Sequence, residues 1–318
     1  MPTSSDRHPL NQSPFYKLRS KRKLADLLRV SQAELRLMCR TADEVYREFS
    51  VPKKDGALRR VEDPARQLKL VQARIARQLS RITPPDYLFC PVKGRCYVSN
   101  AAQHRGNRVV RCLDVRKYFP STPSRRVFWF FHTVMRCERD IAAALAKLAT
   151  YRGHLPTGSP LSPILAYFAH YDVWEAVAVI CREHGYTLTV YIDDVTISGP
   201  KISPTVIWSV KEAIHASGLR YHKEKVFHDR PAEITGVIVD GEQLVAPNRQ
   251  LKKIATLRTA IRSEDRRGLR GADTKQLRLK LGGLQGQIGQ ISSQLRRRPP
   301  PKVRPSTPQP GPSSVGLD

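Results

Sequence analysis

Apolar and polar residues follow two periods along this chain, and the two periods predict helices interleaved with strands. Apolar side chains near helical spacing predict five helical segments: 16–50, 65–81, 124–150, 162–184 and 203–217. Apolar runs of strand length occupy 108–115 and 187–199, and a strand pair is expected around 225–245. A basic helical region is expected over 247–296. This order of elements predicts an α/β or α+β protein.

Three further segments have a composition that predicts their conformation. Residues 51–64 are expected to form a β-hairpin, with Asp55-Gly56 as the turn and basic residues on both arms. Residues 153–163 are rich in Gly and Pro and lead into a helix, so a loop is expected there. Residues 297–318 are rich in Pro and Ser with few large apolar residues, and we expect them to be disordered.

Charge narrows the class of partner. The 318 residues include 55 Lys and Arg against 28 Asp and Glu, a formal charge of +27. Basic residues are spread over the whole chain, whereas a membrane-binding protein usually concentrates them on one amphipathic helix. A nucleic acid is therefore the favoured partner, because Lys and Arg neutralise phosphates. Charge alone does not separate a binding protein from an enzyme.

Length, apolar content and cysteine spacing exclude other classes. The length suggests about two domains, and 40% hydrophobic residues supply a core. The sequence has no run of about 18 apolar residues and no apolar signal region, so a cytoplasmic protein is expected. The six cysteines include no Cys-x-x-Cys pair, which argues against a zinc site and a disulfide framework.

Three acidic residues occupy positions where a charge is costly. Asp114 ends an apolar strand, and Asp193 and Asp194 lie between two strands. At a tight turn both adjacent carboxylates can reach one side, where Asp114 from a neighbouring strand would complete a cluster. Mg²⁺ suits such a cluster, and two ions can activate an attacking 3′-oxygen and stabilise leaving pyrophosphate. The alternative is that Asp193-Asp194 is an ordinary polar turn.

Taken in order, four segments resemble motifs of the reverse transcriptases, over about residues 45–290. They are the hairpin Val51–Pro64, similar to the one that holds the incoming triphosphate; Cys112–Pro120, similar to the first catalytic-acid motif; Leu155–Pro163, similar to the Leu-Pro-Gln-Gly-x-Pro-x-Ser-Pro loop; and Tyr191–Asp194, the Tyr-x-Asp-Asp turn. Two positions depart from the family pattern. Thr157 stands where Gln is usual, and Ile192 stands where a small residue is common.

Two more segments resemble the bacterial retron branch of that family. Asn100–His104 fits its Asn-Ala-x-x-His motif, and Ile234–Gly236 resembles its Val-Thr-Gly motif with Ile for Val. Either motif alone is weak, but their order around the polymerase motifs makes the resemblance specific. By this resemblance, Asn100, His104, Thr235 and Gly236 are candidates for RNA recognition or for the scaffold.

The resemblance also implies the catalytic roles. Asp114, Asp193 and Asp194 would hold two Mg²⁺ ions, for which Mn²⁺ could substitute, with the carbonyl of Val115 as an additional ligand. Phe119, five residues beyond Asp114, matches the aromatic position that excludes a ribose 2′-hydroxyl. The alternative for Phe119 is a core side chain.

Other residues are implied to bind the incoming nucleotide. Arg59 aligns with the arginine that contacts the triphosphate, and Lys53 or Lys54 would assist it, because a guanidinium can grip phosphate oxygens in two places. Gly158 and Ser159 would lie close to the nucleotide, since glycine allows a close backbone approach. The alternatives are a solvated basic face and a simple loop.

The implied fold is an α+β right-hand polymerase with a small antiparallel palm sheet packed on helices. Fingers are expected over 1–110, a palm over 111–245, and a helical thumb over 246–296, with part of the fingers inserted near 122–160. The thumb would follow an RNA–DNA hybrid through its backbone and shape.

The implied function is synthesis of DNA from dNTPs on a dedicated noncoding RNA, primed by a 2′-hydroxyl of that RNA. The product would be the branched RNA–DNA hybrid known for retrons as multicopy single-stranded DNA. A role in anti-phage defence with a separate effector protein is also implied. The alternatives are a group II intron-like or diversity-generating reverse transcriptase, a non-catalytic RNA-binding scaffold, and an enzyme of untemplated terminal addition.

Overall fold

A five-stranded sheet in the order β3-β5-β6-β4-β7 forms the centre of the computed structural model, which describes residues 7–53, 56–266 and 272–295. The strands are β3 (Leu88–Cys90), β4 (Val109–Val115), β5 (Thr187–Tyr191), β6 (Asp194–Gly199) and β7 (Tyr221–His228). All neighbours pair antiparallel except β3 and β5, which are parallel. The prediction of an antiparallel sheet is therefore wrong at this one edge, where β3, a strand from earlier in the chain, pairs in parallel with β5.

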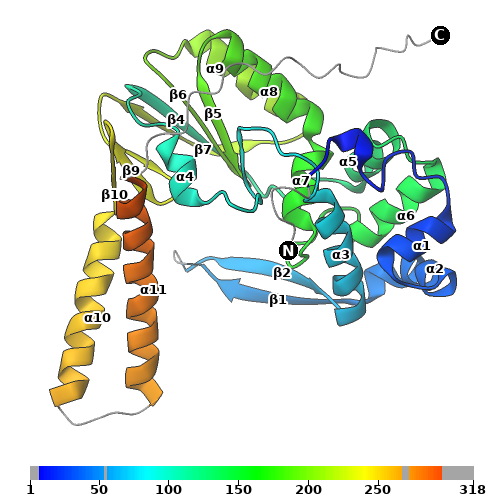
Figure 1. Cartoon of the computed structure of the whole chain (residues 1–318), viewed down its shortest axis with the longest axis horizontal. Helices are drawn as coiled ribbons and strands as arrows, with labels where there is room; N and C mark the ends of the chain where they lie inside the picture. The colour runs from blue at the N-terminus through cyan, green and yellow to red at the C-terminus, as the bar shows by residue number, and fades with distance from the viewer. Residues whose placement is uncertain (1–6, 54–55, 267–271, 296–318) are drawn as a thin grey trace.

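The two faces of the sheet bury different cores, because side chains alternate along each strand. One face packs on α8 (Tyr171–Glu183) and α9 (Pro204–Ala216), and belongs to the main core with Val195 and Ile197 of β6. The other face packs on α4 (Tyr97–Ala102), as Figure 1 shows. The second face also carries the acidic residues at one end of its strands.

A second, smaller core joins α4 to the C-terminal part of the described chain. It contains Val98 of α4, Ile234 and Val237 of a three-stranded sheet, and Ile291 of the last helix. That sheet has the order β10-β9-β8, and the elements that complete this region are β8 (Ala232–Ile234), β9 (Val237–Asp240), β10 (Gln243–Val245), α10 (Asn248–Arg266) and α11 (Ala272–Leu295). The two helices lie along each other and project away from the sheet (Figure 1).

The other half of the molecule is a group of helices with a projecting hairpin. Strands β1 (Tyr46–Pro52) and β2 (Leu58–Pro64) form an antiparallel hairpin, in which Tyr46 pairs with Pro64 and Pro52 pairs with Leu58. The hairpin reaches below the sheet toward α10 and α11 (Figure 1). The helices are α1 (Lys21–Leu28), α2 (Gln32–Thr41), α3 (Arg66–Leu79), α5 (Ser124–Trp129), α6 (Arg139–Ala149) and α7 (Ser162–Ala169), with short 3₁₀ turns at Leu10–Gln12 and Ala42–Glu44 and a π-helical turn at Phe130–Val134.

The predicted elements are present, with four corrections to their bounds. The helical segment expected over 16–50 is two helices, α1 and α2, which begin at Lys21 and end at Thr41. The chain then continues into β1, which pairs with β2. The π-helical turn and the segment after it divide the helix expected over 124–150. A bend at the buried His170 divides the one expected over 162–184. The strand pair expected around 225–245 is four strands, β7 to β10. The disorder expected over 297–318 falls outside the described residues.

No single helix among the described residues is long and apolar enough to cross a membrane. The consecutive helices α7 and α8 reach that length only together, and they are bent by 67° relative to each other.

Candidate active site

The three acidic residues meet at one end of the central sheet. Asp114, near the end of β4, is the cross-strand partner of Asp194, the first residue of β6. Asp193 occupies the β5–β6 turn, and its carbonyl accepts a hydrogen bond of 2.8 Å from the Val115 amide. A bulge between Asp114 and Val115 interrupts the β4–β7 ladder at the same place. The expected convergence of these acids is thus produced by strand register.

The turn that presents Asp193 is strained. Ile192 has a φ of 59°, in the left-handed region that β-branched residues rarely adopt. Its side chain packs against the main core, which holds the residue in this conformation. Strained backbone of this kind persists where the surrounding structure fixes it, and it clusters at functional sites.

The pKa values of Asp193 and Asp194 are both raised. Burial is the largest cause at both residues. At Asp194, burial together with the negative charges of Asp193 and Asp114 raises the pKa to about 6. At Asp193, the charge of Asp114 adds to the effect of burial, and a backbone hydrogen bond opposes it. Arg59 and His222 oppose the increase at Asp193, and Lys225 opposes it at Asp194. His222 Nδ1 also lies 3.6 Å from Asp114 Oδ1. The site therefore holds more negative charge than its surroundings neutralise.

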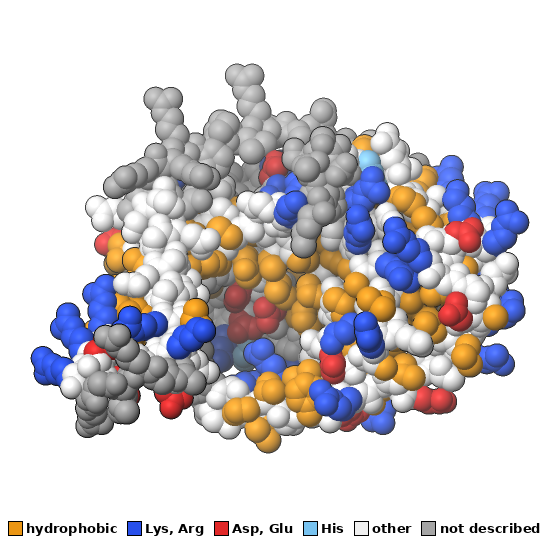
Figure 2. All heavy atoms as spheres, turned by 60° about the horizontal axis from the view of Figure 1, so that its bottom comes forward, with side chains coloured by type: hydrophobic (Ala, Val, Ile, Leu, Met, Phe, Trp, Pro, Cys, Tyr) orange, Lys and Arg blue, Asp and Glu red, His pale blue; other side chains and the backbone are white. Residues whose placement is uncertain are grey.

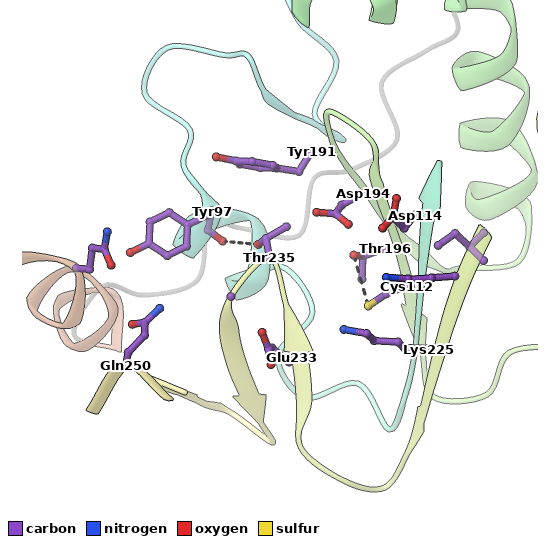
Figure 3. Close-up of a pocket in the computed structure, with 14 residues that line it drawn as sticks. Tyr97, Cys112, Asp114, Tyr191, Asp194, Thr196, Lys225, Glu233, Thr235 and Gln250 are labelled. Carbon is purple, nitrogen blue, oxygen red and sulfur yellow. Dashed lines mark hydrogen bonds between the residues drawn. The ribbon is translucent and has the colours of Figure 1, made fainter. Parts of the chain in front are cut away.

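This acidic end opens into a cavity of about 600 Å³ between the sheet and the C-terminal helices. Its walls include Asp114 and Asp194 from the sheet, Tyr97 from α4, Thr235 from the β8–β9 turn, Gln250 from α10 and Gln287 from α11 (Figure 3). Figure 2 shows the corresponding hollow on this face of the molecule, with acidic side chains on its floor and Lys and Arg side chains beside it.

The donor set fits a hard divalent cation. Carboxylate and carbonyl oxygens are the ligands that Mg²⁺ prefers, and their mutual repulsion is what a cation would offset. Within the part of the chain that the structure describes, no three His, Cys, Asp or Glu side chains are gathered around one point as they would be with a metal bound. The fit is therefore one of chemistry and register, and no coordination distances follow from it.

Among the residues expected to bind the nucleotide, Arg59 carries a positive charge that acts on Asp193. Arg59 is an exposed residue of β2, and its charge opposes the increase in the pKa of Asp193. Lys53 lies at the end of the β1–β2 hairpin, where its amide donates to the Ala57 carbonyl. Lys54 lies outside the described residues. Phe119 is partly exposed and contacts the main core, with its ring 6.0 Å from that of Tyr118.

The loop 153–161 is tied to β2. The Gly158 amide donates to the Glu62 carbonyl at 3.1 Å, and a Cβ at Gly158 would lie 2.6 Å from that oxygen, so only glycine fits. Thr157 Oγ1 bonds to the backbone of Arg60 and Glu62. The Ser159 hydroxyl is buried and donates to Gln72 Oε1 at 2.7 Å. These contacts give Gly158 and Ser159 a structural role at the base of the β1–β2 hairpin.

The four residues expected to recognise RNA or support the scaffold fall into two connected groups. His104 is fully buried, and its two ring nitrogens bond to Ser198 Oγ and Thr189 Oγ1 at 2.6 and 2.8 Å. Burial lowers the His104 pKa to about 3, so the ring is neutral. Asn100 is also buried, and it donates to Thr235 Oγ1 at 3.3 Å. The contacts of Asn100 and His104 favour the scaffold alternative.

Thr235 and Gly236, the other two residues expected to recognise RNA or support the scaffold, lie at the cavity. Thr235 and Gly236 form the β8–β9 turn with φ values of 46° and 87°, and both line the cavity. Sequence reasoning did not select Tyr97, Lys223, Lys225, Gln250 or Gln287, which also line it. The spacing of Lys223 and Lys225 could have indicated a basic face beside the acids, because residues two positions apart on a strand point to the same side of the sheet. The glutamines carried no such signal.

Comparisons with known proteins agree with this geometry. Residues 51–239 match the family described as reverse transcriptase (RNA-dependent DNA polymerase). The Retron Ec86 reverse transcriptase of Escherichia coli is 28% identical over 237 residues, 71% of this chain and 73% of that protein. The Retron Mx65 reverse transcriptase of Myxococcus xanthus is 30% identical over 252 residues, 69% of this chain and 57% of its own length. The Retron Se72 reverse transcriptase of Salmonella heidelberg is 29% identical over 184 residues, which are 56% of this chain and 48% of that protein.

The chain belongs to the reverse transcriptase family, because the family match spans more than half of its length. Within that family, the three relatives named above are retron reverse transcriptases of bacteria. The predicted class of enzyme, an RNA-directed DNA polymerase, and the predicted retron type are thereby confirmed. The chain spans about half the length of the Se72 and Mx65 relatives and nearly three quarters of the Ec86 relative.

Proposed function

We propose that this protein copies a dedicated noncoding RNA into single-stranded DNA by nucleotidyl transfer at Asp114, Asp193 and Asp194. The observation that carries the proposal is the direct pairing of Asp114 with Asp194 across β4 and β6, with Asp193 in the adjoining turn. Three carboxylates at one end of a sheet repel one another, which costs free energy of folding. A polymerase needs such a group of carboxylates, because they would hold the cations that promote nucleotidyl transfer.

The acids and the Val115 carbonyl would hold Mg²⁺, or Mn²⁺ in its place. When bound, the cations would lower the pKa of the attacking hydroxyl and offset the charge of the triphosphate. The protein's own contribution is to fix the carboxylates in register and to hold Asp193 through the hydrogen bond between its carbonyl and Val115.

The incoming nucleotide would lie between the acids and the β1–β2 hairpin. Arg59 is suited to grip its phosphates, with Lys53 and Lys54 assisting, because a guanidinium offers two parallel donors. Phe119 would lie beneath the sugar and exclude a ribose 2′-hydroxyl by contact. Gly158 and Ser159 would act through the position of the hairpin, given their contacts with Glu62 and Gln72.

In this proposal the chain has the parts of a right-hand polymerase. Residues 1–110 are the fingers and 111–245 the palm, with a fingers insertion near 122–160, and 246–296 are the thumb. The projecting β1–β2 hairpin supports this division, as does the α10–α11 pair, which contributes Gln250 and Gln287 to the cavity (Figure 1). The RNA–DNA hybrid would pass between them.

The retron relatives support a specific template and product. We propose priming from a 2′-hydroxyl of the same RNA and accumulation of multicopy single-stranded DNA. A role in anti-phage defence with a separate effector protein would follow from that type.

The test is DNA synthesis by the purified protein with the RNA that copurifies with it. Asp193→Asn with Asp194→Asn should reduce dNTP incorporation at least about a thousandfold, because the charge that holds the cations is lost. RNA binding should remain near the wild-type level. Chelation of divalent cations should abolish synthesis by the wild type, and added Mg²⁺ should restore it.

Asp240→Asn is the matched control, since it removes an exposed carboxylate from the β9–β10 turn away from the acids. Undiminished synthesis by the double variant would contradict the site. RNA binding without synthesis by the wild type would favour the scaffold alternative, and synthesis after removal of the RNA would indicate terminal addition.

A further inference from the structure

Two segments far apart in the sequence form one strongly basic surface in the helical half of the molecule. Residues 15–23 and 132–140 lie side by side, since the Lys17 amide donates to the Met135 carbonyl at 2.8 Å. Together the segments contain seven Lys or Arg residues and two acidic residues. Five of these cations are exposed and make no ion pair among the described residues, and we call them the basic surface: Lys17, Arg22, Lys23, Arg136 and Arg139.

The two acidic residues of these segments do not neutralise the basic surface. Glu138 lies 3.6 Å from Arg19, and Asp140 lies 3.0 Å from Lys21. Each acid therefore already has a cation of its own, and the five remaining positive charges are left facing solvent.

The positions of these cations are unfavourable for the folded protein alone. Lys17 and Arg136 have φ values of 54° and 55°, in the left-handed region where glycine is least strained. Arg22 and Lys23 lie in the first turn of α1, and Arg139 begins α6, where the helix dipole disfavours a positive charge. Exposed charges that are placed at a cost to folding indicate a ligand of opposite charge that offsets it.

The composition of the two segments favours a nucleic acid over a membrane or a protein as that ligand. Faces that bind membranes or proteins expose large apolar side chains, and none of those exposed in the described part of the chain lies in residues 15–23 or 132–140. The cations come from two loops and from the first turns of two helices, rather than from one amphipathic helix. Separate cations without an apolar centre match the repeated phosphates of an RNA backbone.

The basic surface is separate from the active-site cavity. No residue of 15–23 or 132–140 lines that cavity. Helices α1 and α6 lie at the opposite end of the molecule from α10 and α11, which form part of the cavity wall (Figure 1). An RNA that reaches this surface must therefore extend beyond the part that is being copied.

We propose that the basic surface binds the phosphate backbone of a folded part of the template RNA that lies outside the active-site cavity. The inference rests on the proposed function, and it adds a second contact by which the protein would hold its RNA during synthesis. Phosphate contacts position a nucleic acid without reading its bases. The surface would therefore strengthen binding of the RNA without selecting its sequence.

The test measures affinity between the full-length protein and the RNA that copurifies with it, after the two have been separated. The variant Lys17→Gly with Arg136→Gly loses two cations, and glycine adopts both left-handed φ values without strain. At about 0.15 M salt we expect the dissociation constant to rise about 10- to 30-fold. The logarithm of affinity should depend less steeply on the logarithm of salt concentration, by a slope of about 2. The thermal midpoint should not fall.

The chemical step should not change, because the basic surface lies outside the cavity. On a poly(A) template with an oligo(dT) primer, the glycine variant should keep the wild-type kcat and the wild-type KM for dTTP. Lys17→Arg with Arg136→Lys keeps both charges and should keep the affinity for the copurifying RNA.

Arg182→Gln with Lys201→Gln is the matched control, since it removes two exposed cations from the α8–α9 side of the sheet. Its affinity for the RNA should change by less than about threefold, because salt screens distant charges.

Unchanged RNA affinity and salt dependence in the glycine variant would overturn the inference, and so would an equal loss of affinity in the matched control. Unchanged RNA affinity together with weaker binding to phosphatidylglycerol vesicles would overturn it in favour of a membrane. Because binding is measured without synthesis, a wild type that binds the RNA and makes no DNA would contradict the proposed function alone.

Discussion

Phe119 is the residue whose exposure decides between two roles. Its ring contacts the main core and lies near Tyr118, yet part of the side chain remains exposed. Phe119 also follows Asp114 by only five residues in the chain. Replacement by Ala should raise incorporation of ribonucleotides relative to deoxyribonucleotides by about tenfold or more, because a rigid steric barrier is removed at the sugar. Competition between dNTPs and NTPs in one extension reaction measures this ratio. An unchanged ratio would leave Phe119 with only its packing role.

His104 makes stability depend on pH in a direction that burial fixes. Its pKa is lowered to about 3 in the folded protein and is about 6.5 in an unfolded chain, so only the unfolded state takes up a proton between these values. Its contribution to stability is complete above pH 6.5 and falls by about 1.4 kcal/mol per pH unit below it. His104→Asn should flatten the fall in unfolding free energy between pH 6 and 4.5 by about that slope.

Urea unfolding at several pH values measures the effect. His184→Asn, which changes an exposed ring, should keep the wild-type slope. If unfolding free energy falls as steeply with pH in His104→Asn as in the wild type, other groups cause the pH dependence. His170 is the first of these to test, because burial also lowers its pKa to about 3.

The β1–β2 hairpin and the loop 153–161 behave as one element because Gly158 joins them. A methyl group at Gly158 would meet the Glu62 carbonyl at 2.6 Å, and neither backbone can yield without losing a hydrogen bond. Gly158→Ala should therefore destabilise the protein by about 1–3 kcal/mol and raise KM for dNTPs. Thermal unfolding and steady-state extension measure the two effects.

Gly282→Ala in α11 is the informative comparison, since nothing lies within 4 Å of the added carbon. It should be neutral or stabilise by about 0.5–1 kcal/mol, as glycine is a poor helix former. Equal behaviour of the two variants would show that the close contact at Gly158 has no energetic weight.

The molecule as a whole depends on the small second core to place α11 against the sheet. Ile291 is almost fully buried there with Val98 and Val237. Ile291→Ala should cost about 2–5 kcal/mol of unfolding free energy. It should also reduce synthesis, because α11 supplies Gln287 to the cavity. Leu279→Ala, on an exposed part of the same helix, should change stability by less than about 0.5 kcal/mol.

The sequence predicted the β1–β2 hairpin, β4, β5, β6, most helices and the acidic cluster, since each depends on local period or on a contiguous motif. It did not predict β3 or α4, and it predicted a strand pair where the structure has the four strands β7 to β10. Asp193 and Asp194 needed only a tight turn, and Asp114 needed only the end of a strand. The presence of Tyr97 and Gln250 in one cavity was not predictable in this way. It depends on how α4 and α10 dock on the β8–β9 turn, and no local pattern encodes the distance between two helices so far apart in the chain.

The composition of the second core also has a consequence for synthesis on the ribosome. Val98 leaves the exit tunnel long before Ile291, yet the two belong to one apolar cluster. The main core can form from earlier residues, while the α4 face of the sheet waits for the last helix. A nascent chain would therefore carry its acidic residues in an incomplete pocket, and it would acquire the wall that contains Gln287 only when translation reaches the end of α11.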